Sequence, residues 1–252
     1  CRMEPDVLDV YTPTTVRVRV RPQAAVPAGT VIACQLPNSF YAYRISQSHT
    51  QRLQTEDPAG PAYVSVDVVE PAASPLGFQV EIAARELITD TEGQVRHGQR
   101  VLATLTGGDL PAGGEVVFTF ARMYSPWVAN QQEYFLVSIG ETVVEPWPTF
   151  RVRPGPAVWQ RLIVPSCARP GEPFRALLVS LDRYDNVSSS AYAGVTLALE
   201  GEPGEAGAIL EDQIAFQGRY ETQVSLPEEG VYRLLARGTL GAGADAAGLW
   251  AG

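Results

Sequence analysis

Lysine is absent from the sequence: all 19 basic residues are arginine, and 28 acidic residues outnumber them, which gives a formal net charge of −9. Without lysine, neither a Schiff base nor a lysine-dependent phosphate-binding loop can form. No block of basic residues is present either, and binding to nucleic acid or to an anionic membrane needs clustered positive charge. The sequence therefore predicts an acidic protein with no nucleic-acid partner.

Histidine is scarce as well, since only His49 and His97 are present. A three-histidine metal site is thereby excluded, and a Ser–His–Asp site would have to use one of these two. We expect His49 in a polar loop and His97 in a turn, both facing solvent, although Glu86, Asp90 and Glu92 leave an acid–base pair with His97 open. The sequence predicts a chain that is not an enzyme and that binds no metal or cofactor.

The three cysteines, Cys1, Cys34 and Cys167, are too few and too widely spaced for a disulfide framework or a zinc site. Cys34 follows an apolar run and is expected in the core, whereas Cys167 is expected at a strand end. Free thiols favour a reducing, cytoplasmic location over export. A first residue other than methionine indicates a fragment or a processed product, with a lipidated Cys1 as an alternative.

Long hydrophobic runs and helical periodicity are also lacking. No apolar run approaches the roughly 18 residues of a membrane span, and no helix-period segment exceeds about two turns, with one short turn expected at Ala83–Leu87. Apolar and polar residues alternate instead, as they do in a strand with one face in solvent. Strands are expected at 16–21, 63–68, 78–82, 100–106, 115–120, 133–139, 149–153, 161–164, 174–181, 195–199, 219–226 and 230–236.

Glycine (23 residues) and proline (20 residues) cluster between these segments, a pattern that favours an all-β fold of two β-sandwich domains. A boundary is expected at Arg153–Pro156, because two prolines around a glycine cannot continue a central strand. Residues 1–153 are then an irregular sandwich. Residues 157–240 offer about seven strand positions, the number typical of an immunoglobulin-like sandwich, and residues 241–252 are expected to be a loose tail.

A series of short motifs in the second half resembles bacterial immunoglobulin-like modules. These modules begin with Pro-Gly-Glu and contain an Asp-x-Tyr-Gly-Asn turn, in which Asp185 stands here in place of the glycine. The matching segments are 170–174, 181–186, 194–197 and 230–234. Together with the order of the strands before them, the whole chain resembles the N-terminal β-rich region of the bacterial domain-of-unknown-function family 3604.

The resemblance implies a function that the residues of this chain do not carry themselves. The C-terminal part of that family resembles a metal-dependent phosphoesterase of the polymerase-and-histidinol-phosphatase type, and none of its metal ligands can be matched here. We therefore expect an N-terminal fragment: a non-catalytic accessory or scaffold region of a larger bacterial protein, with the downstream domain of the same chain as its partner.

Asp182, Asp185 and Asn186 form the densest group of side-chain oxygens, and with Glu172 they raise the question of a calcium site. Their spacing lacks the ligand pattern and the closing glutamate of a calcium loop. Aspartate and asparagine are also the residues that turns select for local hydrogen bonds to the backbone. We therefore expect a turn at this position.

The candidate site residues are aromatic: Tyr124, Trp127, Trp147 and Trp159. Neighbouring prolines place Trp127 and Trp147 in loops, where aromatic rings can form a platform for a sugar ring. This pattern makes a carbohydrate-binding module the alternative function. The favoured interpretation is that the rings cover a joint between the two domains, with Trp147 and Trp159 facing it, because large amphipathic rings bury well there.

Overall fold

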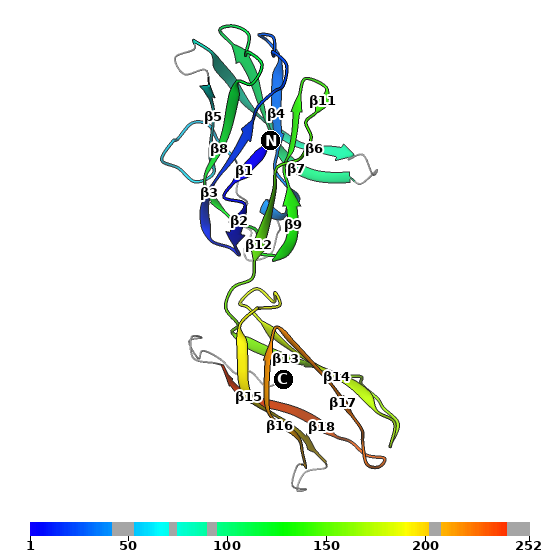
Figure 1. Ribbon diagram of the computed structural model, residues 1–252. Coiled ribbons are helices and arrows are strands. Elements are labelled where there is room, and N and C mark those ends of the chain that lie inside the picture. The colour runs from blue at the N-terminus through cyan, green and yellow to red at the C-terminus, as the bar shows by residue number, and fades with distance from the viewer. Residues whose placement is uncertain (42–52, 71–74, 90–94, 202–207, 241–252) are drawn as a thin grey trace. The chain divides into compact units, whose positions relative to one another are not determined.

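The computed structural model describes residues 1–41, 53–70, 75–89, 95–201 and 208–240 (Figure 1). The chain divides into two compact units, unit 1 (Cys1–Arg153) and unit 2 (Pro154–Gly252), and this boundary coincides with the start of the predicted linker. Within the described ranges every element is a strand except one 3-10 turn, η1 (Asn38–Tyr41), which confirms the all-β fold class. No helix in these ranges has the length and apolar character needed to cross a membrane.

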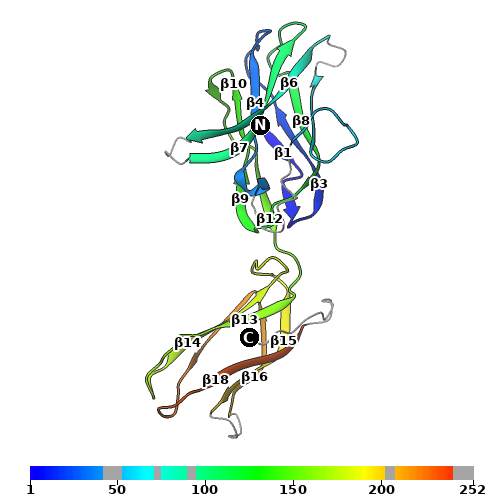
Figure 2. The ribbon, with the colours of Figure 1, turned by 180° about the vertical axis from the view of Figure 1, so that it is seen from behind.

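Unit 1 contains three sheets, in the orders β1-β3-β8-β5, β11-β10-β4-β7-β6 and β2-β12-β9. The two larger sheets form facing layers, which the views from both sides show (Figures 1 and 2). The strands are β1 (Arg2–Glu4), β2 (Val7–Asp9), β3 (Pro13–Val20), β4 (Val31–Gln35), β5 (Tyr63–Glu70), β6 (Gly77–Thr89), β7 (Val95–Thr106), β8 (Glu115–Tyr124), β9 (Asn130–Tyr134), β10 (Leu136–Ile139), β11 (Thr142–Val143) and β12 (Thr149–Arg153).

The core of unit 1 follows from the alternation in the sequence. Val16, Val18 and Val20 of β3 are completely buried, whereas the arginines between them lie on the outer face of the sheet. The single strand predicted at 133–139 is divided into β9 and β10 by Phe135. Its ring is fully buried, within 5.9 Å of the rings of Phe40, Phe120 and Phe150, so the chain leaves the strand to place this side chain in the core.

The short turn predicted at Ala83–Leu87 is wrong, because these residues belong to β6. Ala83 pairs with Arg100 of β7 and Leu87 pairs with His97, so His97 also lies in a strand and not in a turn. The register shifts between Ala83 and Glu86. Such an irregularity interrupts the period of two on which the strand prediction depended, and for that reason both strands of this hairpin are longer than expected.

Unit 2 consists of six described strands in the order β13-β14-β17-β16-β15-β18, where about seven were expected. They are β13 (Trp159–Ile163), β14 (Phe174–Leu181), β15 (Ala191–Glu200), β16 (Ala208–Gln217), β17 (Arg219–Val224) and β18 (Arg233–Leu240). β16 and β17 share only the pair Gln217–Arg219, around Gly218 with a φ of +73°. The sheet therefore has two three-stranded halves, and both halves contribute to one core.

The turn after β14 is built around Asp182, whose side chain is almost completely buried. Its carboxylate accepts hydrogen bonds from the backbone N–H groups of Tyr184 (2.8 Å) and Asn186 (2.9 Å). Asp185 has a φ of +66°, the left-handed conformation that favours glycine. It therefore adopts the backbone conformation expected for the glycine that it replaces in the turn motif. The turn predicted at these residues is confirmed.

The same carboxylate holds the first residues of unit 2. Asp182 also accepts a hydrogen bond from the N–H of Gly155 (2.8 Å), and the Ser188 hydroxyl donates to the Gly155 carbonyl oxygen (2.8 Å). Two residues further along both segments, the N–H of Ala157 donates to the Ser190 hydroxyl (3.1 Å). The segment predicted as a linker is thus tied to the β14–β15 connection from Gly155 onward.

Replacing Asp182 with alanine should lower the free energy of unfolding by about 2–3 kcal/mol, because three backbone N–H groups lose a charged acceptor in a buried position. Asp185→Gly is the matched control in the same turn, and it should stay within about 1 kcal/mol of the parent since glycine adopts a positive φ without strain. Urea denaturation followed by circular dichroism measures both. Equal losses in the two variants would contradict the special role of Asp182.

Candidate functional site

The four candidate aromatic residues are distributed over both units. Tyr124 ends β8, Trp127 lies in the loop after it, and Trp147 lies in the loop between β11 and β12, all in unit 1. Trp159 is the first residue of β13 in unit 2. The shared surface expected for Trp147 and Trp159 stays a prediction, because it concerns the two units together.

Trp147 is half-buried, and its ring stacks on Tyr134 of β9 with the ring centroids 4.6 Å apart and the planes 28° from parallel. The indole N–H is buried and finds no hydrogen-bond acceptor within the described residues. Stacking of this kind occupies one face of the indole ring. A sugar could therefore stack only on the opposite face.

Tyr124 and Trp159 also make contacts inside their own units. The Tyr124 ring stacks on Tyr11 with a centroid distance of 4.9 Å. Trp159 is half-buried, and its carbonyl oxygen accepts a hydrogen bond from the Tyr192 hydroxyl (3.2 Å). Burial raises the pKa of Tyr192 to about 12, so this hydroxyl keeps its proton and remains a donor at all physiological pH values. Both aromatic residues thus have structural contacts that the sequence alone did not reveal.

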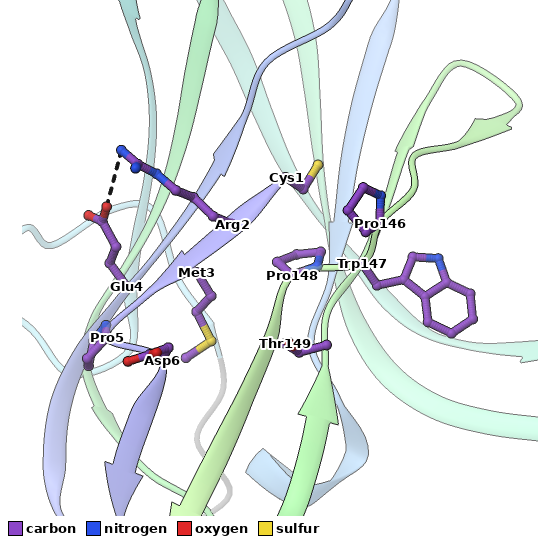
Figure 3. A pocket seen from close by; sticks show the side chains of 10 residues that line it. All are labelled: Cys1, Arg2, Met3, Glu4, Pro5, Asp6, Pro146, Trp147, Pro148 and Thr149. Atoms are coloured by element: carbon purple, nitrogen blue, oxygen red, sulfur yellow. Dashed lines mark ion pairs between the residues drawn. The ribbon is translucent and has the colours of Figure 1, made fainter.

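A hollow of about 570 Å³ in unit 1 is lined by residues 1–6 and 146–149 (Figure 3). The side chains of Arg2 and Glu4 form an ion pair across 3.4 Å at one side of it. Pro146 and Pro148 lie toward β1, whereas the ring of Trp147 points away from β1 (Figure 3). The hollow therefore combines charged groups with apolar proline surface, a lining suited to a small polar ligand.

The strongest electrostatic cluster of unit 1 is one that the sequence did not single out. Glu115 of β8 has a side chain only 4% exposed, and it accepts hydrogen bonds from Arg19 of β3 (2.9 Å) and from Arg21, just after the end of β3 (3.0 Å). Arg19 continues to Glu4 (3.0 Å) and Arg21 to Glu70 (3.2 Å). The cluster joins β1, β3, β5 and β8, so it binds the four strands of one sheet together.

The charge of Glu115 is stabilised within this cluster. Burial alone raises the pKa of its carboxyl group, but the hydrogen bond and positive charge of Arg21, together with those of Arg19, outweigh burial and lower the pKa below its ordinary value. A carboxylate held ionised between two guanidinium groups is a poor proton donor or acceptor at neutral pH. The arrangement suits a structural role better than acid–base catalysis.

Only some of the remaining reactive residues lie in the part of the chain that the structure describes. His49, Asp90 and Glu92 lie outside the described residues, as does the tail expected at 241–252. Cys34 is completely buried, which raises the pKa of its thiol, while Cys167 is exposed. Within the described part of the chain no three His, Cys, Asp or Glu side chains cluster closely enough to hold a metal ion.

The chain was compared with family models and with curated proteins. No family model matches the chain, and no curated protein matches it either.

Glu115→Gln should lower the free energy of unfolding by about 1–2 kcal/mol at neutral pH, because Arg19 and the more exposed Arg21 lose the charge of a carboxylate that is only 4% exposed. The pKa of Glu115 in the folded protein is lowered, whereas an unfolded glutamate has a pKa of about 4.3. Its contribution is therefore complete above that pH and is lost as the pH falls through the lower folded pKa. The parent should lose more stability than the variant between about pH 5 and pH 3.

Glu70→Gln is the control for this experiment, because the Glu70 side chain is 55% exposed and its ion pair is with Arg21, at the exposed end of the cluster. Its replacement should change the unfolding free energy by less than about 0.5 kcal/mol. Denaturant unfolding at several pH values measures both variants. Parallel pH profiles for the parent and Glu115→Gln would contradict the role assigned to Glu115.

Proposed function

We propose that the chain is a non-catalytic accessory region of a larger bacterial protein, and that it holds and orients a further domain of that protein. The resemblance of its motifs to the N-terminal β-rich region of family 3604 favours this role, as does the resemblance of unit 2 to an immunoglobulin-like module. The proposal extends to the cytoplasmic location that the free thiols favour.

The observation that carries the proposal is the short connection between the two units. β12 ends at Arg153, and Gly155 already has its N–H and its carbonyl oxygen bonded within unit 2. Pro154 alone remains between these two points, and its ring restricts the backbone. A connection of one restricted residue suits a protein whose task is to hold an orientation, and it does not suit a flexible tether.

The hydrogen bonds of the two most buried acidic side chains also favour a non-catalytic role. Asp182 and Glu115 are the most deeply buried carboxylates among the described residues, and each is occupied by several donors of the fold itself. Neither carboxylate has an acceptor oxygen free of such contacts. Groups that are held in this way stabilise a scaffold, whereas a catalytic acid or base needs access to a substrate.

Lengthening the connection tests the proposed role. Four residues, Gly-Ser-Gly-Ser, inserted after Pro154 should let the units tumble separately, whereas the parent should tumble as one body. Residual dipolar couplings measured for both units report this, with one alignment tensor expected for the parent and two for the variant. The same insertion after Gly140, in the exposed β10–β11 turn, is the matched control and should leave one tensor. Two different tensors in the parent would contradict the proposal.

A second candidate function is carbohydrate binding, favoured by the hollow beside the loop that carries Trp147. The lining of the hollow contains both charged side chains and apolar proline rings. A sugar presents hydroxyl groups and apolar ring faces together, and such a lining can meet both. On this proposal, residues 1–6 and 146–149 form the binding site.

Trp147→Ala should abolish binding to any polysaccharide that the parent retains in a glycan screen, because the variant loses the indole face opposite Tyr134, in the loop that lines the hollow. Trp159→Ala is the matched control: it removes an equally half-buried tryptophan from unit 2 and should leave glycan binding unchanged. Thermal denaturation of both variants separates loss of binding from loss of folding. A parent that binds no polysaccharide, or equal loss in both variants, would count against this second function.

A further inference from the structure

The outer edge of β18 is a long, regular strand edge that no described strand covers. β18 is the last strand in the order of the sheet of unit 2, and it pairs with β15 alone. Its residues Arg233–Arg237 pair with Thr196–Glu200 without a register shift, and the one shift of the β15–β18 pair lies beyond them, between Ala193 and Thr196. The backbone N–H and C=O groups on its other side therefore form an even row that a further strand can recognise.

The other edge strand of the sheet, β13, is less suited to pairing. β13 has five residues and lies between Pro156 and Pro165, which limits pairing along it. Inside the sheet, β16 shares only the pair Gln217–Arg219 with β17, but it carries the acidic residues Glu211 and Asp212 and has three register shifts against β15. β18 contains eight residues, no proline and no acidic residue. Among these edges, β18 is the one suited to pairing.

The two faces of β18 differ, and both have apolar surface next to the edge. Leu234 and Ala236 lie on the inner face, opposite the buried residues Leu199 and Leu197 of β15. Both pack against the core but are only partly buried. Leu235 lies on the outer face, in one row with Ala198 and with Ile209, which is 67% exposed. An added strand would cover apolar surface on both faces of the sheet.

We propose that β18 pairs with β18 of a second copy of this chain, antiparallel around a two-fold axis. The two copies of β16-β15-β18 then form one continuous sheet. A two-fold interface uses the same surface twice, so it needs an edge that complements itself. The sequence of β18 meets this need in a register centred on Ala236.

Charge disfavours the two adjacent registers. With Ala236 opposite Ala236 of the other copy, Leu235 faces Arg237 on the outer side and Leu234 faces Gly238 on the inner side, so no arginine faces an arginine. A shift of the centre to Leu235 would place Arg233 opposite Arg237, and a shift to Arg237 would place that residue opposite itself. Like charges directly opposite each other destabilise a strand pair. Arg237 is already paired with Glu200 (2.8 Å), which leaves its side-chain stem to cover Leu235 of the other copy.

Sedimentation velocity of the whole chain over a range of concentrations tests the proposal. The parent should shift from the mass of one chain to the mass of two. Leu235→Lys places a third positive charge on the outer face of the edge, and it should raise the dissociation constant at least about tenfold. Ile209→Lys is the matched control on the same face, two strands from the edge, and its dissociation constant should equal that of the parent.

Hydrogen exchange identifies the surface that forms the dimer. Backbone amides of residues 233–239 should exchange more slowly as the protein concentration rises, whereas amides of β13 should not change. A parent that remains a monomer at every concentration would overturn the proposal. So would a dimer that Leu235→Lys does not weaken, or one whose protection lies outside β18.

Discussion

The carboxylate of Asp182 is the contact on which the organisation of the chain depends. It closes the turn after β14 through the N–H groups of Tyr184 and Asn186, and it fixes Gly155 at the start of unit 2. A charged acceptor bonded to several N–H groups in a buried position is worth more than the same bonds made in water. One side chain thus joins a local turn to the connection between the units, and the proposed scaffold role follows from that connection.

Unit 1 is stabilised by a different use of charge. Glu115 accepts hydrogen bonds from two arginines on the outer face of a four-stranded sheet, and each arginine also contacts a glutamate on a further strand of that sheet. The absence of lysine fits this arrangement, because a guanidinium group can donate to two carboxylates at once in a fixed plane. The two most deeply buried carboxylates of the described residues, one in each unit, therefore serve the fold.

Contacts within unit 1 limit how much of the candidate aromatic residues a ligand could reach. Proline neighbours placed Trp127 and Trp147 correctly in loops, but Tyr134 stacks on Trp147 and Tyr11 stacks on Tyr124. Tyr11 is distant from Tyr124 in the sequence, and no motif connects Tyr134 with Trp147. One face of each of these two rings is thus covered by a tyrosine of unit 1. The hollow next to the Trp147 loop is also lined by residues 1–6, and no pattern in the sequence connected these residues to that loop.

The sequence alone determined the all-β class, most strand positions and the turn at Asp182–Asn186. These features depend on residues that are close in the sequence, through alternation, proline and side-chain bonds to the nearby backbone. Only the tertiary structure decided which carboxylate meets Arg19 and Arg21, since Glu115 is 96 and 94 residues away from them. It likewise decided that β18 lies at an edge. Strand order and register arise from pairing across the whole chain, and periodicity within one segment carries no information about either.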